Sequence, residues 1–212
     1  MTNCYKEQIK ELLSNGAPID GIGVQCHFKD AERNVNPIQV TDKFNSLAEL
    51  GLPIWVTEFD VSQSNPIERA KHMEYFMRAA FSHPSVEGLL FWGYWDQRHW
   101  RGKQASLVDG HNFVLNAAGK KYRELVFDKW WSKETHTVST GVKSTRIFKG
   151  DYTITIKDNN KILETRSISV TEAKDICFGD KSKCSTNVAM KAIAQKSSEE
   201  NMEGSGTTEV DF

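Results

Sequence analysis

The chain has 212 residues, enough for one large domain or two small ones. Its 27 basic and 28 acidic side chains nearly cancel, so nothing suggests a nucleic acid or an anionic membrane surface as a partner. No apolar run is long enough to span a bilayer, and no basic-then-apolar signal segment opens the chain. Four cysteines are too few for a disulfide scaffold, so we expect a globular protein that is stabilised by an apolar core.

The first elements alternate between helix and strand. Apolar residues at helical spacing predict a helix over residues 5–13. Residues 19–28 predict a buried strand whose second face becomes polar at its end, with Gln25 and His27. A second helix is predicted to begin near Thr41 and to end before Gly51.

Residues 52–61 predict a second buried strand, rich in β-branched and aromatic residues. Regular alternation places four side chains on one face of this strand: Ile54, Val56, Glu58 and Asp60. The opposite face carries Trp55, which we expect to pack in the core beneath the helices. Because buried carboxylates are costly unless they are paired or used, the acidic end of this strand indicates either a functional site or a solvated strand end.

The clearest helix start of the chain follows. Asn65 suits an N-cap position and Pro66 suits the first helical turn. A third strand is predicted over residues 86–93, followed by an aromatic and charged loop over 94–101. A last helix is predicted from about residue 116 to 131.

The three strands begin near residues 20, 53 and 86, a spacing that suits repeated βα units and a parallel sheet. Chemistry in such folds gathers at the carboxyl ends of the strands. That rule selects five side chains: Gln25, His27, Glu58, Asp60 and Trp92.

The two carboxylates can serve as metal ligands, as a base or as a nucleophile. A metal would need more converging ligands than His27 alone can add, so we expect none. A nucleophile needs an ionised carboxylate held by hydrogen bonds, which His27 can supply to Glu58 while Asp60 orients His27. Trp92 and Trp100 offer flat faces for a sugar ring, although each can also be core packing.

The composition changes after residue 131. We expect a barrel portion over 1–132, a small antiparallel β module over 136–171 and a disordered tail over 172–212. The module has strand-like runs at 145–148, 152–156 and 162–170, with a turn at 158–160 between the last two; within the tail, residues 188–194 can form a brief helix. Cys177 and Cys184 can form a small disulfide loop or remain two free thiols.

Three runs of sequence resemble glycoside hydrolase family ten, the endo-1,4-β-xylanases. They are GAPIDGIGVQCHF at 16–28, LPIWVTEFDV at 52–61, and GLLFWGYWD at 88–96 with HWR at 99–101. These runs are similar to the sixth, seventh and eighth barrel strands of that family, in order and at matching spacing. The resemblance covers roughly residues 1–131 and implies an α/β fold, a partial (β/α)8 TIM barrel followed by the β module.

The resemblance implies that Glu58 is the nucleophile of a retaining glycosidase, which His27 and Asp60 hold ionised and oriented. Three further residues would contact the sugar: Gln25, Trp92 and Trp100. It implies a β-1,4-linked, xylan-like polysaccharide as partner, no cofactor, and a secreted location, since the family is usually secreted.

Retaining enzymes need a second carboxyl group about 5–5.5 Å from the nucleophile. In this family it is a Glu that follows an Asn at the end of the fourth strand, and we expect that half of the barrel to be missing here. Asp60 cannot replace it, because it lies on the same strand as Glu58. The chain is therefore expected to be a truncated xylanase; the alternatives are a polysaccharide-binding fragment without catalysis and an inactive remnant.

Overall fold

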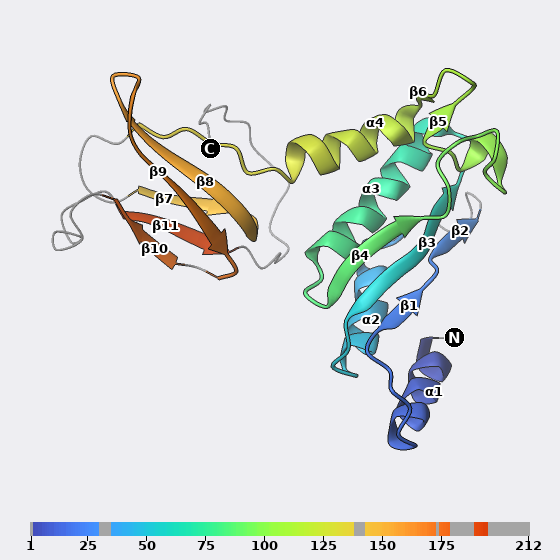
Figure 1. The fold of residues 1–212 in the computed structure, drawn as a ribbon. Helices are drawn as coiled ribbons and strands as arrows, with labels where there is room; N and C mark the ends of the chain where they lie inside the picture. Colours follow the sequence, from blue (N-terminus) through green and yellow to red (C-terminus); the bar gives the residue numbers. More distant parts are fainter. Residues whose placement is uncertain (1, 30–34, 138–142, 173, 179–188, 195–212) are drawn as a thin grey trace. The chain divides into compact units, whose positions relative to one another are not determined.

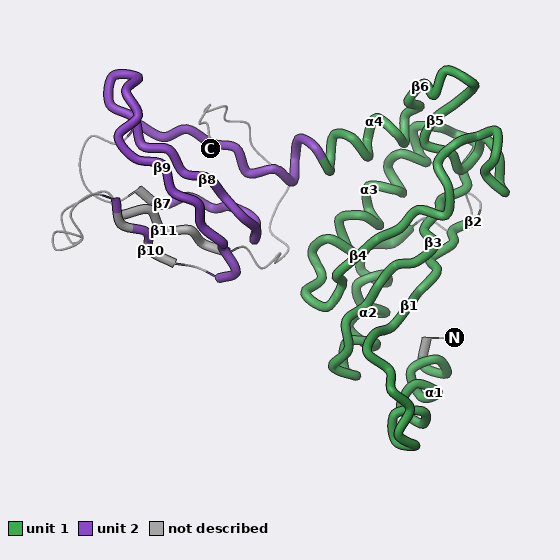
Figure 2. The backbone as a smooth tube through the Cα atoms, viewed as in Figure 1, with its two compact units in different colours: residues 1–126 green, residues 127–212 purple. Residues whose placement is uncertain are grey.

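The computed structural model describes residues 2–29, 35–137, 143–172, 174–178 and 189–194. It divides into two compact units, residues 1–126 and 127–212 (Figure 2). This division lies close to the expected end of the barrel portion. No helix in the described part of the chain is long and apolar enough to cross a membrane.

A parallel sheet forms the centre of the first unit (Figure 1). Its central strand is β3 (Ile54–Ser62), which pairs on one side with β1 (Ile22–Val24) and then β2 (His27–Lys29). β4 (Val86–Phe91) also pairs with β3 in parallel. The predicted parallel arrangement of the three strand regions is thus confirmed.

Helices connect these strands, as the sequence predicted. They are α1 (Thr2–Ser14), α2 (Pro37–Ala48), α3 (Pro66–Ser82) and α4 (Ala117–Arg123), the last continued by a π-helical segment, η2 (Glu124–Lys129). Between β4 and α4 lie a 3₁₀ turn, η1 (Gly102–Gln104), and a short hairpin of β5 (Val108–Asp109) and β6 (Val114–Leu115).

Local capping determines where these helices begin. The Asn65 side chain accepts hydrogen bonds from the amides of Ile67 and Glu68, as predicted for the start of α3. Asn36 caps α2 in the same way, with Pro37 at its first turn. The helix therefore begins before Thr41, and the later start that we expected is wrong.

The core between the sheet and its helices is aromatic. Phe59 of β3 stacks on Phe76 of α3 with ring centroids 4.2 Å apart, and Phe28 and Phe44 contact Phe76 edge-on. Phe59 and Phe76 are almost completely buried. Burial of rings this large contributes much of the stability of such a core.

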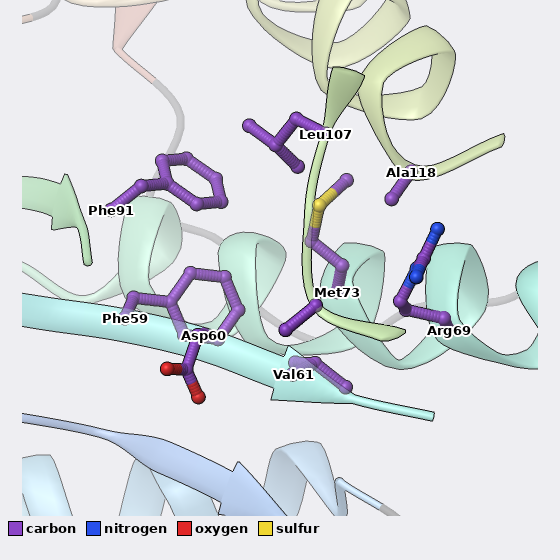
Figure 3. Close-up of a pocket in the computed structure, with 9 residues that line it drawn as sticks. Phe59, Asp60, Val61, Arg69, Met73, Phe91, Leu107 and Ala118 are labelled. Carbon is purple, nitrogen blue, oxygen red and sulfur yellow. The ribbon is translucent and has the colours of Figure 1, made fainter. Parts of the chain in front are cut away.

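The polar end of β3 does not follow the alternation predicted from the sequence. Ile54, Val56 and Phe59 are all buried, and Phe59 packs on α3. The pairing with β4 shifts in register between Val56 and Phe59, which marks a β-bulge. Glu58 and Asp60 therefore share the face opposite to the one that packs on α3, and Figure 3 shows Asp60 and Phe59 on opposite sides of the strand. The prediction that Ile54 and Val56 lie on the carboxylate face is wrong.

Trp55 also lies outside the expected core. It is 45% exposed, while its neighbours Ile54 and Val56 are fully buried. Its ring lies so close to Gly88 of β4 that a Cβ added there would be 2.3 Å from a ring carbon. Trp55 thus covers the face of the sheet that the helices leave open.

The predicted strand over 19–28 is also interrupted. Cys26, between β1 and β2, has a φ of 63°, in the left-handed region that a non-glycine residue rarely adopts. β1 pairs with residues from Ile54 onward, and β2 pairs with residues from Asp60 onward. The interruption lies next to the two polar residues that were predicted at the strand end.

The described part of the second unit contains a two-stranded antiparallel sheet and a three-stranded mixed sheet, so the prediction of a purely antiparallel module is wrong. β8 (Gly150–Asp158) and β9 (Lys161–Val170) form the predicted hairpin, with Asn159 and Asn160 in the left-handed conformation of a tight turn. β7 (Lys143–Ile147) pairs with β11 (Ala189–Ala194).

Part of the expected disordered tail is in fact a sheet. β10 (Lys174–Cys177) pairs antiparallel with β11, which lies between β10 and β7. Residues 189–194 are therefore a strand, and the predicted helix is wrong because pairing with two neighbours overrides the local preference. The possible disulfide of Cys177 and Cys184 lies outside the described residues.

Candidate active site

Four predicted polar side chains converge around the gap between β1 and β2 and the neighbouring part of β3: Gln25, His27, Glu58 and Asp60. The bulge in β3 and the left-handed Cys26 both lie at this point of the sheet. Bulges are frequent beside active sites because they redirect a side chain. The sheet therefore departs from regular geometry where its polar residues meet.

His27 bridges the two carboxylates. Its Nδ1 lies 3.0 Å from Asp60 Oδ2, and its Nε2 lies 3.1 Å from Glu58 Oε2. Each ring nitrogen can donate a hydrogen bond to the carboxylate oxygen that it faces. His27 therefore connects Asp60 to Glu58.

Glu58 remains accessible, while Asp60 does not. The Glu58 side chain is 23% exposed and receives a second contact, at 3.4 Å, from Nε2 of Gln25. The Asp60 side chain is 1% exposed. Of the two carboxylates, Glu58 is thus the one that a ligand can reach.

Two residues of the loop after β4 complete the surroundings of Asp60. The indole N–H of Trp100 donates to Asp60 Oδ2 at 2.7 Å, and Arg101 Nη1 lies 3.0 Å from Asp60 Oδ1. The contact with Arg101 is an ion pair and not an aligned hydrogen bond, because Oδ1 meets no donor at hydrogen-bonding geometry among the described residues. Arg101 was quoted in the HWR motif, but sequence reasoning did not assign it to the site.

Two predicted aromatic residues flank His27. The ring of Trp92 lies 6.3 Å from the His27 ring and that of Trp100 lies 5.1 Å away, both in edge-on geometry. Trp92 is 47% exposed and Trp100 is 61% exposed. Both therefore offer exposed aromatic surface beside His27, although the Trp100 N–H already donates to Asp60.

Burial changes the titration of two neighbouring groups. His99 is buried next to Trp100, and desolvation lowers the pKa of its imidazole. Its Nδ1 accepts from the Arg101 backbone N–H at 3.1 Å. Desolvation raises the pKa of the Cys26 thiol to about 12, so this thiol is a poor nucleophile.

A small cavity lies on the other face of β3 (Figure 3). Residues from β3, α3, β4, α4 and the loop between them line it, among them Phe59, Arg69, Met73 and Leu107. Its volume of about 10 Å³ suits a single water-sized molecule, so it is not a sugar-binding cleft. No group of three or more His, Cys, Asp or Glu residues in the described part of the chain can hold a metal ion.

The fold and the site define a class: part of a (β/α) barrel with a carboxylate site at the ends of parallel strands. Residues 1–129 match the family model described as glycosyl hydrolase family 10. The chain belongs to this family, and its first unit is a fragment of a TIM barrel.

Curated relatives support the assignment. Endo-1,4-β-xylanase 1 of Arabidopsis thaliana is 35% identical over 178 residues, which are 83% of this chain and 18% of that protein. Anti-sigma-I factor RsgI6 of Acetivibrio thermocellus is 40% identical over 148 residues, 68% of this chain and 19% of that protein. The chain thus spans less than one fifth of the length of either relative.

A solved structure shows the same fold. Xylanase 10B from Thermotoga petrophila, determined in complex with xylobiose, superposes with a TM-score of 0.53 at 28% identity. The match covers 60% of this chain and 42% of the xylanase. The structural likeness is therefore to a part of a complete barrel.

Proposed function

We propose that the first unit is the nucleophile-bearing part of a retaining endo-β-1,4-xylanase, corresponding to barrel strands six to eight. Glu58 is the nucleophile, and His27 and Asp60 keep it ionised and oriented. The bridge of His27 between the two carboxylates is the observation that carries this proposal. A retaining mechanism needs an ionised, accessible carboxylate, and Glu58 is the accessible member of this pair.

The sugar is proposed to bind beside Glu58. Gln25 contacts Glu58 and can hydrogen-bond a sugar hydroxyl, while Trp92 and Trp100 provide aromatic faces for the glycone. The names of the relatives, and the xylobiose in the solved xylanase, support a xylan-like β-1,4-linked polysaccharide as the substrate class.

The reaction proceeds in two steps. A carboxylate oxygen of Glu58 forms a bond to the anomeric carbon, while the bond from that carbon to the leaving oxygen breaks and the leaving oxygen takes a proton from a general acid. In the second step a water oxygen forms a bond to the anomeric carbon, the bond from that carbon to Glu58 breaks, and the same acid/base residue takes the proton of the water. We propose that the general acid belongs to a part of the barrel outside this chain, since the chain spans less than half of the xylanase structure that it matches.

An activated inhibitor tests the nucleophile without the general acid. In 2,4-dinitrophenyl 2-deoxy-2-fluoro-β-xylobioside the leaving group departs as a stable anion, so its departure needs no proton donor. The fluorine slows release of the sugar from the enzyme, so the covalent adduct accumulates. We expect intact-mass spectrometry to show one added fluoroxylobiosyl group, and peptide mapping to place it on Glu58.

Two variants separate chemistry from binding. Glu58→Gln should abolish labelling while retaining affinity for xylohexaose in calorimetry, because the amide keeps the shape of the carboxylate and loses its charge. Glu87→Gln, on the exposed part of β4, is the matched control and should label like the unmodified chain. Absence of any adduct on Glu58 at saturating inhibitor would contradict the proposal.

A second candidate is polysaccharide binding without cleavage, which the exposure of Trp92 and Trp100 favours. In that case xylohexaose binds and Trp92→Ala weakens it, yet the inhibitor leaves Glu58 unmodified. Trp92 is the better test of the two, because Trp100 also donates to Asp60.

A further inference from the structure

We infer that Arg101 is a positioning residue that keeps Glu58 ionised, acting through Asp60 and His27. This inference rests on the proposed role of Glu58 as the nucleophile. It adds to the site a cation from a loop that follows a different strand, 41 positions beyond Asp60 in the sequence.

Four independent contacts fix the Arg101 side chain and backbone. Nη1 lies 3.0 Å from Asp60 Oδ1 and donates to the backbone carbonyl of Phe28 at 2.8 Å. The guanidinium carbon lies 4.5 Å from the centroid of the Trp100 ring, within cation–π range. The Arg101 backbone N–H donates to His99 Nδ1, and the side chain is only 16% exposed. This arginine is therefore not a solvated surface cation.

Asp60 depends on Arg101 for the compensation of its charge. The carboxylate is almost completely buried, and an isolated buried carboxylate is strongly disfavoured. Oδ2 has two donors, His27 and Trp100, whereas Arg101 is the contact of Oδ1. Among the described residues, Arg101 is the only arginine or lysine within 4.0 Å of this carboxylate.

The charges then alternate along a row of four residues: Arg101, Asp60, His27 and Glu58. With both carboxylates ionised, the ring of His27 donates from both nitrogens and its positive charge lies between them. The row as a whole is neutral. Removing the Arg101 charge leaves a net negative row, so Asp60 takes up a proton more readily. A neutral Asp60 no longer stabilises the positive charge of His27, so the ring gives up a proton more readily and Glu58 loses its charged donor.

Other charged groups nearby do not substitute for Arg101. His99 is adjacent, but burial lowers the pKa of its imidazole and favours the neutral ring. Arg69 of α3 donates to the backbone carbonyl of Lys103 and interacts electrostatically with Asp109. Neither supplies a positive charge in contact with Asp60.

The experiment compares Arg101→Gln, Arg101→Lys and the control Arg98→Gln, which removes the same charge from an exposed position of the same loop. The rate of labelling by the dinitrophenyl fluoroxylobioside is measured from pH 4 to 8. For Arg101→Gln we expect the acidic limb of the profile to move upward by about one to two pH units, the size expected for losing one close opposite charge, with the plateau rate retained. Arg101→Lys keeps the positive charge, so its profile should lie close to that of the unmodified chain. The profile of Arg98→Gln should superimpose on that of the unmodified chain.

Nitrogen-15 NMR of the imidazole of His27 gives a second readout that does not need catalysis. In the unmodified chain, at the pH of the labelling plateau, both ring nitrogens should show protonated signals. In Arg101→Gln, one nitrogen should show the signal of a neutral ring at the same pH. Circular dichroism confirms that each variant is folded before either measurement.

The two readouts separate the inference from the proposed function. An unlabelled Glu58 together with a doubly protonated His27 would reject the nucleophile and leave the charge row intact. A neutral His27 in the unmodified chain would overturn the row, even if Arg101→Gln fails to fold. Identical pH profiles and identical His27 signals for folded Arg101→Gln and the unmodified chain would overturn the role of Arg101.

Discussion

Asp60→Asn tests the site through stability, because it removes one negative charge and changes almost no volume. Three donors face the carboxylate: His27 Nδ1 at 3.0 Å, Trp100 Nε1 at 2.7 Å and Arg101 Nη1 at 3.0 Å. An asparagine oxygen can still accept from His27 and Trp100. The amide NH₂ group then occupies the position of Oδ1, where it faces the guanidinium, so a donor meets a donor.

The size of the loss follows from burial. Breaking a buried ion pair by removing one partner costs about 3–5 kcal/mol, and each hydrogen bond to a charged group contributes about 1.5–3 kcal/mol. The Asp60 side chain is 1% exposed, so solvent cannot replace these contacts, although Arg101 at 16% keeps a little access to water. We therefore expect the free energy of unfolding to fall by about 3 kcal/mol or more, a large part of the roughly 5–15 kcal/mol of an ordinary domain.

Urea unfolding of the whole chain, followed by tryptophan fluorescence, measures this loss. With a slope of about 1–3 kcal/mol per molar urea, the midpoint of the transition that reports on the first unit should fall by at least about 1 M. Asp20→Asn, at an exposed position, removes the same charge and should stay within about 0.5 kcal/mol of the unmodified chain. A change below about 1 kcal/mol for Asp60→Asn would refute the account of Asp60 as a buried, charged acceptor.

Three further outcomes follow from packing and burial. Gly119→Ala should lower the free energy of unfolding of the first unit by about 1–3 kcal/mol in urea unfolding, because its Cβ would lie 2.1 Å from a backbone oxygen. Gly88→Ala should cost less, because its Cβ would meet the ring of a half-exposed tryptophan that can move. Cys26, with its pKa raised to about 12, should react with iodoacetamide at pH 8 at least about ten-fold more slowly than the exposed Cys4, as read by peptide mass spectrometry. Burial lowers the pKa of His83 below its usual 6.5, so the unfolded chain binds a proton at a higher pH than the folded chain does. The free energy of unfolding should therefore fall as the pH drops from about 6.5 to the folded pKa, and His83→Gln should flatten this dependence in urea unfolding at a series of pH values.

The starts of the helices could be predicted from their capping residues. Asn65 and Pro66 predicted the start of α3, and the side chain of Asn65 caps it. The same pair, Asn36 and Pro37, begins α2, whereas apolar spacing alone indicates a start near Thr41. The capping residues therefore define the start of this helix more sharply than its apolar periodicity does.

The position of the site could be predicted from where the strands end. His27 and Gln25 were expected beside Glu58 because parallel strands end at one edge of a sheet, and their contacts with Glu58 confirm this arrangement. The bulge before Phe59 was not predictable, because a register shift depends on pairing with β4 and leaves no period in the sequence. For the same reason the faces of Ile54 and Val56 were assigned wrongly.

In the second unit, only the pairing between neighbouring strands could be predicted from the sequence. The hairpin of β8 and β9 was predicted, since two runs of alternating residues flank a turn of asparagines. The pairing of β7 with β11 joins segments more than forty positions apart, and short segments such as β11 carry little local information about their state. Strand formation there follows from the partner strands and not from the segment itself.

The contacts that would keep Glu58 ionised all lie within the first unit. They come from the end of β1, from β2 and β3, and from the loop after β4, and the core beneath them is fixed by the stacking of Phe59 on Phe76. The proposed nucleophile can therefore be prepared independently of the residue that protonates the leaving group. We therefore expect the outcome to depend on the leaving group of the substrate. An activated aryl glycoside should form an adduct with this chain, whereas xylan should bind without being cleaved until a barrel portion that carries the acid is added in trans.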